Sequence, residues 1–152
     1  GAAVKDLPQG GFLVAKIHQL SGRIFARMLK KHGIEEINPA QGRILFALWK
    51  EDCIPIRELS VRTQLEKSTL TSMLDRLEES GFVVREPSKD DRRKILIRRT
   101  EKDRSFQKRY IAVSEEMLSL YYRGLSPKEI AAFESTCERI LSNLSGECDE
   151  SE

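Results

Sequence analysis

Apolar side chains recur every three or four residues along much of the chain, which places them on one face of an α-helix. The first such stripe predicts a helix over about residues 10–31 and consists of Leu13, Ile17, Leu20, Ile24 and Met28. Gly33 follows a basic Lys-Lys-His segment and is a suitable stop for this helix. A long amphipathic helix is therefore the first predicted element.

Three shorter helices are predicted next. Asn38 followed by Pro39 is typical of a helix N-cap and first helical position, and it predicts a helix over about residues 39–51. After a break at residues 52–55, a short helix fits residues 56–63. A turn at residues 64–66 then leads to a helix over about residues 67–80, which ends at Ser80-Gly81.

Two apolar runs with a charged segment between them predict a β-hairpin. The strands are expected at residues 82–86 and 95–99, and the tip at residues 87–94. Thr100 is a good N-cap, and Asp103 three residues later gives an approximate capping box for a helix reaching about residue 122. Gly124 interrupts the helical spacing, which Ser126-Pro127 restarts and which continues to residue 144.

The order of these elements predicts a mainly α protein with a small β-hairpin, a winged helix-turn-helix flanked by long helices. Two helices joined by a tight turn precede a two-stranded ribbon, and such a module places its second helix in the major groove of DNA. We expect a single domain over residues 10–144, with the winged lobe at about 38–100 and dimerisation helices at about 10–31 and 101–144. Residues 145–152 are polar and acidic and are expected to form a flexible tail.

Charge is unevenly distributed although the formal net charge is only +2. Residues 85–99 contain seven basic and three acidic side chains, whereas residues 134–152 contain one basic and six acidic side chains. A basic segment in the middle of the chain is a reason to consider nucleic acid as a partner. No apolar run approaches the ~18 residues of a membrane span, and no secretion signal is visible, so we expect a cytoplasmic protein without membrane contact.

The chemistry of an enzyme or a metal site is not indicated. No nucleophile–base arrangement, glycine-rich phosphate loop or HExxH motif occurs, so we predict no catalytic residues and no cofactor. The spacing of His18, His32 and Cys137 fits no known ligand pattern, so no metal site is expected. Cys53, Cys137 and Cys148 are far apart, and the sequence leaves open whether any of them is redox-active.

The segment from the short helix through the hairpin resembles the MarR family, the multiple antibiotic resistance regulators. The resemblance rests on residues 56–59, residues 67–83, Arg85 and the run from Asp91 to Ile97. The family pattern is Asp-x-Arg in the wing, an apolar strand and then Leu-Thr-x-x-Gly. Asp91, Arg93 and Thr100 match it, whereas Arg99 and Asp103 replace the leucine and the glycine.

The resemblance implies a homodimer that binds double-stranded DNA at a pseudo-palindromic site. In family members the first and last helices interleave with those of the partner, and many members are released by a small aromatic or phenolic effector. Tyr110, Tyr121, Phe25 and Trp49 are candidates for lining an effector pocket, although aromatic residues at helical spacing are more often part of the core. Other family members respond to oxidation of a cysteine near the start of the first helix, which this chain lacks.

Side chains of three kinds are candidate DNA contacts. The first turns of the helix at 67–80 carry hydroxyls and cations, and further cations lie in the wing and beside the short helix; they are Arg57, Lys67, Ser68, Thr69, Thr71, Ser72, Arg76, Lys89, Arg92 and Arg93. Asp91 is expected to orient a wing arginine through a bidentate contact. For some of these residues a structural role is open: Ser68 or Thr69 as a simple N-cap, and Arg76 in an ion pair with Asp75, Glu79 or Asp91.

We therefore predict a sequence-specific DNA-binding transcriptional regulator, a repressor that a small ligand releases. The alternatives are a winged-helix module that binds protein, in which case the charged tip merely protects a strand edge, and a DNA binder without an effector. The sequence leaves open the operator, the effector and the regulated genes.

Overall fold

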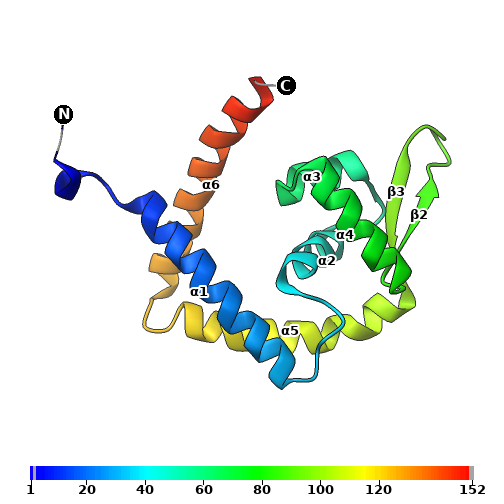
Figure 1. Ribbon diagram of the computed structural model, residues 1–152, viewed down its shortest axis with the longest axis horizontal. Coiled ribbons are helices and arrows are strands. Elements are labelled where there is room, and N and C mark those ends of the chain that lie inside the picture. The colour runs from blue at the N-terminus through cyan, green and yellow to red at the C-terminus, as the bar shows by residue number, and fades with distance from the viewer. Residues whose placement is uncertain (2, 151–152) are drawn as a thin grey trace. The chain divides into compact units, whose positions relative to one another are not determined.

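The computed structural model describes residue 1 and residues 3–150, with side chains up to residue 147. Helices dominate, and a β-hairpin connects the fourth α-helix to the fifth (Figure 1). The order is η1 (Val4–Asp6), α1 (Gly10–Lys31), α2 (Pro39–Lys50), β1 (Ile54–Pro55), α3 (Ile56–Thr63), α4 (Lys67–Glu79), β2 (Val83–Pro87), β3 (Ile95–Arg99), α5 (Glu101–Tyr121) and α6 (Pro127–Glu150). The predicted mainly α winged-helix fold is confirmed.

The chain packs as two compact units, Gly1–Glu115 and Glu116–Glu152. The first unit contains the winged lobe together with α1 and most of α5. The assignment of residues 10–144 to a single domain stays a prediction. No helix in the described part of the chain combines the length and the apolar character that a bilayer crossing requires.

Local signals at the helix ends act as the sequence suggested. Gly33 follows α1 with a φ of 74°, a conformation that costs glycine little. At the start of α2, the Gln41 backbone N–H donates to the Asn38 side chain at 2.8 Å, and the Asn38 backbone N–H donates to the Gln41 side chain at 3.0 Å. This reciprocal capping box, with Pro39 at the first helical position, fixes where α2 begins.

The sheet contains one strand more than the predicted hairpin. Its order is β1-β3-β2, and both pairings are antiparallel. Ile54 pairs with Ile97, so β1 covers the edge of β3 that the hairpin alone would leave open. Residues 52–55 were expected to be only a break, because a strand of two residues has no periodicity that a sequence can display.

A dense apolar core holds α2, α3, α4 and the sheet together. Helix α4 contributes Leu70, Leu74 and Leu77, and the hairpin contributes Val83 and Ile97, all with no exposed surface. Burying one leucine side chain stabilises the fold by about 2 kcal/mol. The three leucines therefore fix which face of α4 points inward, and with it the face that remains outside.

The second unit is held by an aromatic cluster between the end of α5 and α6. The rings of Tyr121, Tyr122 and Phe133 contact one another, with centroids 5.0–6.5 Å apart. Helix α6 continues through residues 145–150, where the sequence predicted the start of a flexible tail. Residues 151 and 152 of that predicted tail lie outside the described residues.

Candidate nucleic-acid interface

Helix α4 presents a polar face opposite its buried leucines. That exposed face carries every candidate that the sequence placed on this helix: Lys67, Ser68, Thr69, Thr71, Ser72 and Arg76. Hydroxyl and cationic side chains are the donors that reach base edges and phosphates in known protein–DNA complexes. The structure thus brings the six candidates together on one helix and turns them outward.

The N-terminus of α4 is not capped by a side chain. Glu66 occupies the N-cap position and makes no side-chain cap hydrogen bond, and the first turn contains no acidic residue. The suggestion that Ser68 or Thr69 serves as the N-cap is therefore wrong, because both lie inside the helix. The first backbone N–H groups of a helix have no partner within it, and together with Lys67 they make this end of α4 favourable for a phosphate.

Arg76 is exposed and is not engaged by the carboxylates considered for it. Among the residues that the structure describes, it forms no ion pair; Asp75 instead contacts Arg85 at 2.8 Å. Arg76 therefore keeps its five donors available on the outward face of α4.

Arg85 joins the hairpin to α4, a role that the sequence analysis did not recognise. Its guanidinium contacts Asp75 at 2.8 Å and Glu78 at 3.2 Å, and it also donates to the Thr71 carbonyl oxygen at 3.2 Å. The backbone N–H of Arg85 donates to Glu78 at 2.9 Å. In the sequence, Arg85 follows the helix carboxylates Asp75 and Glu78, which is a signal for an ion pair. The sequence does not show which of these carboxylates faces the strand.

The wing, residues 87–94, is a closed turn. The Ser88 backbone N–H donates to the Lys94 carbonyl at 2.9 Å, and the Ser88 hydroxyl accepts from the backbone N–H of Asp90 at 3.2 Å. Asp91 contacts Arg93 through both carboxylate oxygens, at 3.1 and 3.4 Å, and also accepts the Arg93 backbone N–H at 3.1 Å. These bonds from Arg93 hold the pKa of the Asp91 carboxyl below its ordinary value.

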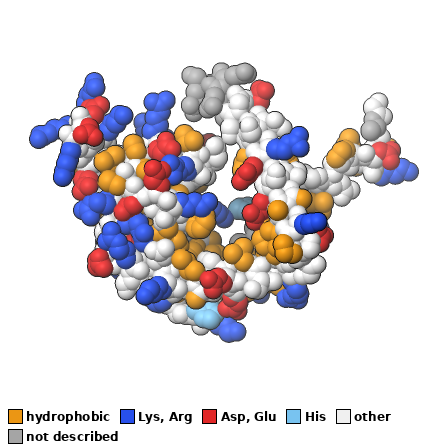
Figure 2. All heavy atoms as spheres, turned by 180° about the vertical axis from the view of Figure 1, so that it is seen from behind, with side chains coloured by type: hydrophobic (Ala, Val, Ile, Leu, Met, Phe, Trp, Pro, Cys, Tyr) orange, Lys and Arg blue, Asp and Glu red, His pale blue; other side chains and the backbone are white. Residues whose placement is uncertain are grey.

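The remaining cations of the wing are exposed. Lys89, Arg92 and Lys94 form no ion pair with any residue that the structure describes, and the Arg93 side chain is 91% exposed despite its contact with Asp91. Figure 2 shows Lys and Arg side chains gathered along the edge of the molecule that contains the wing. Such a group of available cations attracts phosphate.

The two arginines of α3 differ. Arg62 is tied to Glu58 at 3.1 Å and also pairs with Glu51, and these bonds raise its pKa. Arg57 is exposed in the first turn of α3 and forms no ion pair in the described part of the chain. Arg57 is therefore the arginine of this helix that is available to a phosphate.

Three of the four aromatic candidates for an effector pocket meet in one cluster. The Tyr110 ring lies 5.5 Å from that of Phe25 and 5.6 Å from that of Trp49, measured between centroids. A Cβ atom at Gly42 would overlap the Tyr110 hydroxyl, so a glycine at this position leaves the space that the phenol occupies. Burial raises the pKa of Tyr110 to about 12. Tyr121, the fourth candidate, belongs to the second unit.

Within the described residues, the cysteines and histidines form no cluster suited to a metal. No group of three or more metal-ligating side chains occurs in the part of the chain that the structure describes. Cys53 is exposed and Cys137 is half-buried. The side chain of Cys148 lies outside the described residues.

Residues 37–95, from the residue before the N-cap of α2 to the first residue of β3, match the model of the MarR family. The chain carries a MarR-family domain. The resemblance inferred from the helix and wing motifs is thereby confirmed. MarR-family members are transcriptional regulators and not enzymes, which agrees with the expectation that this chain is not an enzyme.

Curated relatives and solved structures extend the likeness. The HTH-type transcriptional regulator TtmR of Methylorubrum extorquens is 35% identical over 86 residues, which span 57% of this chain and 43% of that protein. The HTH-type transcriptional repressor IacR of Pseudomonas putida is 26% identical over 133 residues, which span 88% of this chain and 78% of that one. The chain thus covers less than half of TtmR and most of IacR.

Two solved structures show the same fold. A mutant MarR from E. coli complexed with operator DNA has a TM-score of 0.77 at 24% identity, covering 92% of this chain and 99% of that one. BpsR of Bordetella bronchiseptica, whose DNA binding is regulated by 6-hydroxynicotinic acid, has a TM-score of 0.79 at 19% identity and covers 92% and 96%. At these identities the likeness concerns the fold.

Proposed function

We propose that this protein is a sequence-specific transcriptional regulator that binds double-stranded DNA as a homodimer. Helix α4 enters the major groove, and the wing holds the phosphate backbone or the minor groove. The observation that carries the proposal is the outward face of α4, where six donor side chains lie opposite a buried row of leucines. Arg85 ties this helix to the hairpin whose tip holds the available cations.

The roles of the side chains follow from their chemistry. Thr71, Ser72 and Arg76 can reach base edges, because hydroxyls and guanidinium groups donate to the acceptors of the major groove. Lys67, Ser68 and Thr69 surround the helix N-terminus and are placed to bind a phosphate. Arg57, Lys89, Arg92 and Arg93 supply further phosphate contacts, and Asp91 keeps Arg93 in one orientation.

Exposed apolar side chains support the homodimer. On α1, Phe12, Leu13, Val14, Ile17 and Leu20 are between 39% and 65% exposed. In the second unit, Ile140, Leu141 and Leu144 of α6 are between 49% and 59% exposed. Contiguous apolar surface of this kind marks an interaction site, and a symmetric dimer pairs it with its own copy and calls for a pseudo-palindromic DNA site.

A small aromatic or phenolic effector and a repressor role complete the proposal. IacR is named a repressor, and the DNA binding of BpsR is regulated by 6-hydroxynicotinic acid. Helix α5 carries both Tyr110 and the first turn that adjoins the hairpin. A ligand that moves α5 would change the spacing of the two α4 helices, which must match grooves about 34 Å apart. A regulator that binds DNA acts in the compartment that contains the chromosome, and the cytoplasmic location predicted from the sequence is part of this proposal.

The first test is enrichment of duplexes from a randomised pool, followed by binding across a range of salt concentrations. We compare the wild type with Arg92→Ala/Arg93→Ala and with Lys108→Ala/Arg109→Ala, a control that removes two adjacent exposed cations from α5. We expect a two-fold-symmetric site and a decrease in salt slope of about one to two in the wing variant only. Equal behaviour of the two variants would contradict the role of the wing, and failure to enrich any site would favour a protein partner.

The effector is tested separately with the enriched duplex. Small aromatic acids and phenols are added to the complex of the wild-type protein, and dissociation is followed by fluorescence anisotropy. We expect at least one compound class to lower the affinity. If no compound does so, the protein is a DNA binder without an effector of this class.

A further inference from the structure

The first turn of α5 contains a fully buried carboxylate. Asp103 has no exposed surface, although a charged group is costly to remove from water unless partners compensate it. The capping box expected for this residue is only half formed: the Asp103 backbone N–H donates to the Thr100 hydroxyl at 3.3 Å, but the Asp103 carboxylate points elsewhere.

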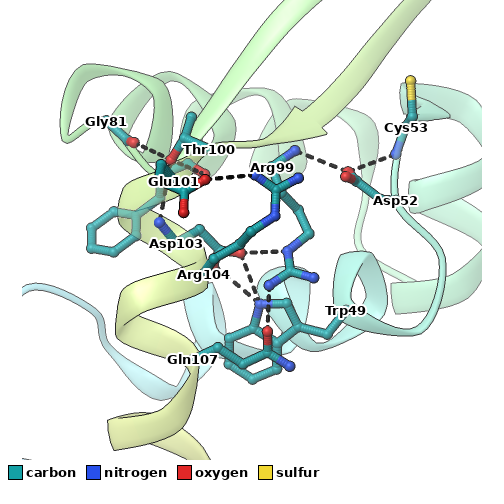
Figure 3. Close-up of polar contacts among 11 residues, drawn as sticks. Trp49, Asp52, Cys53, Gly81, Arg99, Thr100, Glu101, Asp103, Arg104 and Gln107 are labelled. Carbon is teal, nitrogen blue, oxygen red and sulfur yellow. Dashed lines mark hydrogen bonds and ion pairs between the residues drawn. The ribbon is translucent and has the colours of Figure 1, made fainter.

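Three elements meet at this carboxylate (Figure 3). Arg99, the last residue of β3, contacts it at 2.6 Å. The indole N–H of Trp49 in α2 donates to both carboxylate oxygens, at 3.1 and 3.0 Å. The Arg99 guanidinium also donates to Gln107 of α5, and its backbone N–H donates to Asp52 at 2.9 Å. One buried ion pair thus ties the hairpin to α2 and α5.

The same turn also holds the end of α4. The Thr100 hydroxyl donates to the Gly81 carbonyl at 2.6 Å, and the Lys102 ammonium donates to the Ser80 carbonyl at 2.6 Å (Figure 3 shows the first of these bonds). Both carbonyls lie directly after α4, where the last groups of a helix lack internal partners. The start of α5 therefore contacts both elements proposed to touch DNA.

We propose that Asp103 is a positioning residue for DNA binding, which holds Arg99 and so fixes the direction in which the wing leaves the lobe. This inference rests on the proposed function. The ion pair of the adjacent residue, Arg98, shows why the attachment of the hairpin to the lobe depends on Arg99. Arg98 contacts Glu86 of β2 at 3.1 Å, and the two side chains are 45% and 40% exposed. That pair joins the two strands of the hairpin to each other and leaves the hairpin's attachment to the lobe unaffected.

The electrostatics of the site agree with this assignment. Burial raises the pKa of the Asp103 carboxyl, and Asp52 acts in the same direction, whereas Arg99 and Trp49 oppose the shift. The ionised form thus depends on its two donors. The Asp103 carboxylate holds Arg99 and Trp49 through charge and hydrogen bonds. A substitution that preserves the shape of the side chain but removes its charge therefore tests these contacts separately from packing.

The test uses Asp103→Asn, with Glu86→Gln as the matched control that removes the same charge from the partner of Arg98. Each is measured in the wild type and in the Arg92→Ala/Arg93→Ala background, with the enriched duplex as probe. We expect Asp103→Asn to lower the affinity about tenfold in the wild type. In the wing-deficient background we expect Asp103→Asn to change the affinity less than twofold, because a wing without its arginines gains nothing from being positioned. We also expect less than a twofold effect of Glu86→Gln, because that carboxylate pairs with Arg98 inside the hairpin.

A second variant guards against simple loss of folding. Arg99→Leu/Asp103→Leu removes both charges together, and such replacements of a buried ion pair usually leave a protein folded. Thermal unfolding followed by circular dichroism establishes the folded fraction, and the emission of Trp49, the single tryptophan, reports the lost carboxylate. We expect a folded protein with shifted emission and the same background-dependent loss of affinity.

The outcomes separate the two proposals. A wild type that prefers no duplex overturns both the proposed function and this inference. A wild type that binds specifically, together with Asp103 variants that are folded and bind equally well, overturns this inference alone. A loss of the same factor in both backgrounds also overturns it, because a general loss of stability acts regardless of the wing arginines.

Discussion

Glu78 of α4 accepts two hydrogen bonds from Arg85 of β2, one from the backbone N–H at 2.9 Å and one from the guanidinium at 3.2 Å. Because both bonds converge on one carboxylate, the start of the hairpin cannot move independently of α4. The Thr71 carbonyl, which accepts from the same guanidinium at 3.2 Å, extends this attachment two turns towards the N-terminus of the helix. The position of the wing relative to α4 is therefore fixed before either element contacts DNA.

Arg85→Ala is expected to lower the free energy of unfolding by about 1–2 kcal/mol, because it removes three contacts of a side chain that is 21% exposed. The matched control is Arg98→Ala, which removes an exposed ion pair of the same hairpin and should cost less than about 0.5 kcal/mol. Urea unfolding of the two variants measures the difference. Equal costs would show that Arg85 does not anchor the hairpin.

Gly42→Ala is expected to destabilise the protein by about 2 kcal/mol or more, since the new methyl group overlaps the Tyr110 hydroxyl in a closely packed region. Gly22→Ala is the control, because a Cβ there meets no atom within 4 Å and alanine favours a helix over glycine. Thermal unfolding distinguishes the two. Similar melting temperatures for the two variants would contradict the contact between α2 and Tyr110.

Tyrosine ionisation should be suppressed in the folded protein. Burial raises the pKa of Tyr110 to about 12, and the hydrogen bond to Glu134 raises that of Tyr122 to about 12. Both values exceed the unfolded value of about 10. The associated stability is therefore complete below pH ~10 and is lost as the pH rises towards 12. Absorbance at alkaline pH should show tyrosinate earlier in Glu134→Gln than in the wild type; identical curves would contradict the Tyr122–Glu134 bond.

Asp91 should order the wing only while it is ionised. Its pKa is lowered by the bonds from Arg93, so the stabilising contribution is present above the unfolded pKa and disappears as the pH falls through the folded one. Asp91→Asn is expected to bind DNA less tightly than Asp90→Asn, about threefold or more, although both remove one negative charge from the wing. If the two variants bind alike, the orientation of Arg93 has no effect on affinity.

The helical part of the fold was predictable because each helix carries its own apolar stripe and terminal signals. Helix α1 begins and ends where its stripe and Gly33 indicated, and α2 begins at the predicted Asn38-Pro39 cap. Strand β1 was missed because its two residues acquire their structure only by pairing with β3. The extension of α6 was missed because Ser145 onward lacks the apolar spacing on which the prediction relied.

The candidate site was predictable in composition but not in connectivity. The exposure of the α4 residues follows from the leucine stripe, which the sequence displays. The bond from Trp49 to Asp103 joins residues 54 positions apart, and no local pattern encodes it. For the same reason Asp103 was interpreted as a local capping residue, and the side chain of Arg85 had no assigned partner.

The central claim is that α4 and the wing recognise a particular DNA sequence. The most direct test is the affinity of the wild-type protein for the enriched duplex relative to a scrambled duplex of the same length and composition, measured at about 0.15 M salt. The proposed function predicts a preference of about a thousandfold or more. A ratio close to one would contradict it, because binding would then depend on phosphate alone.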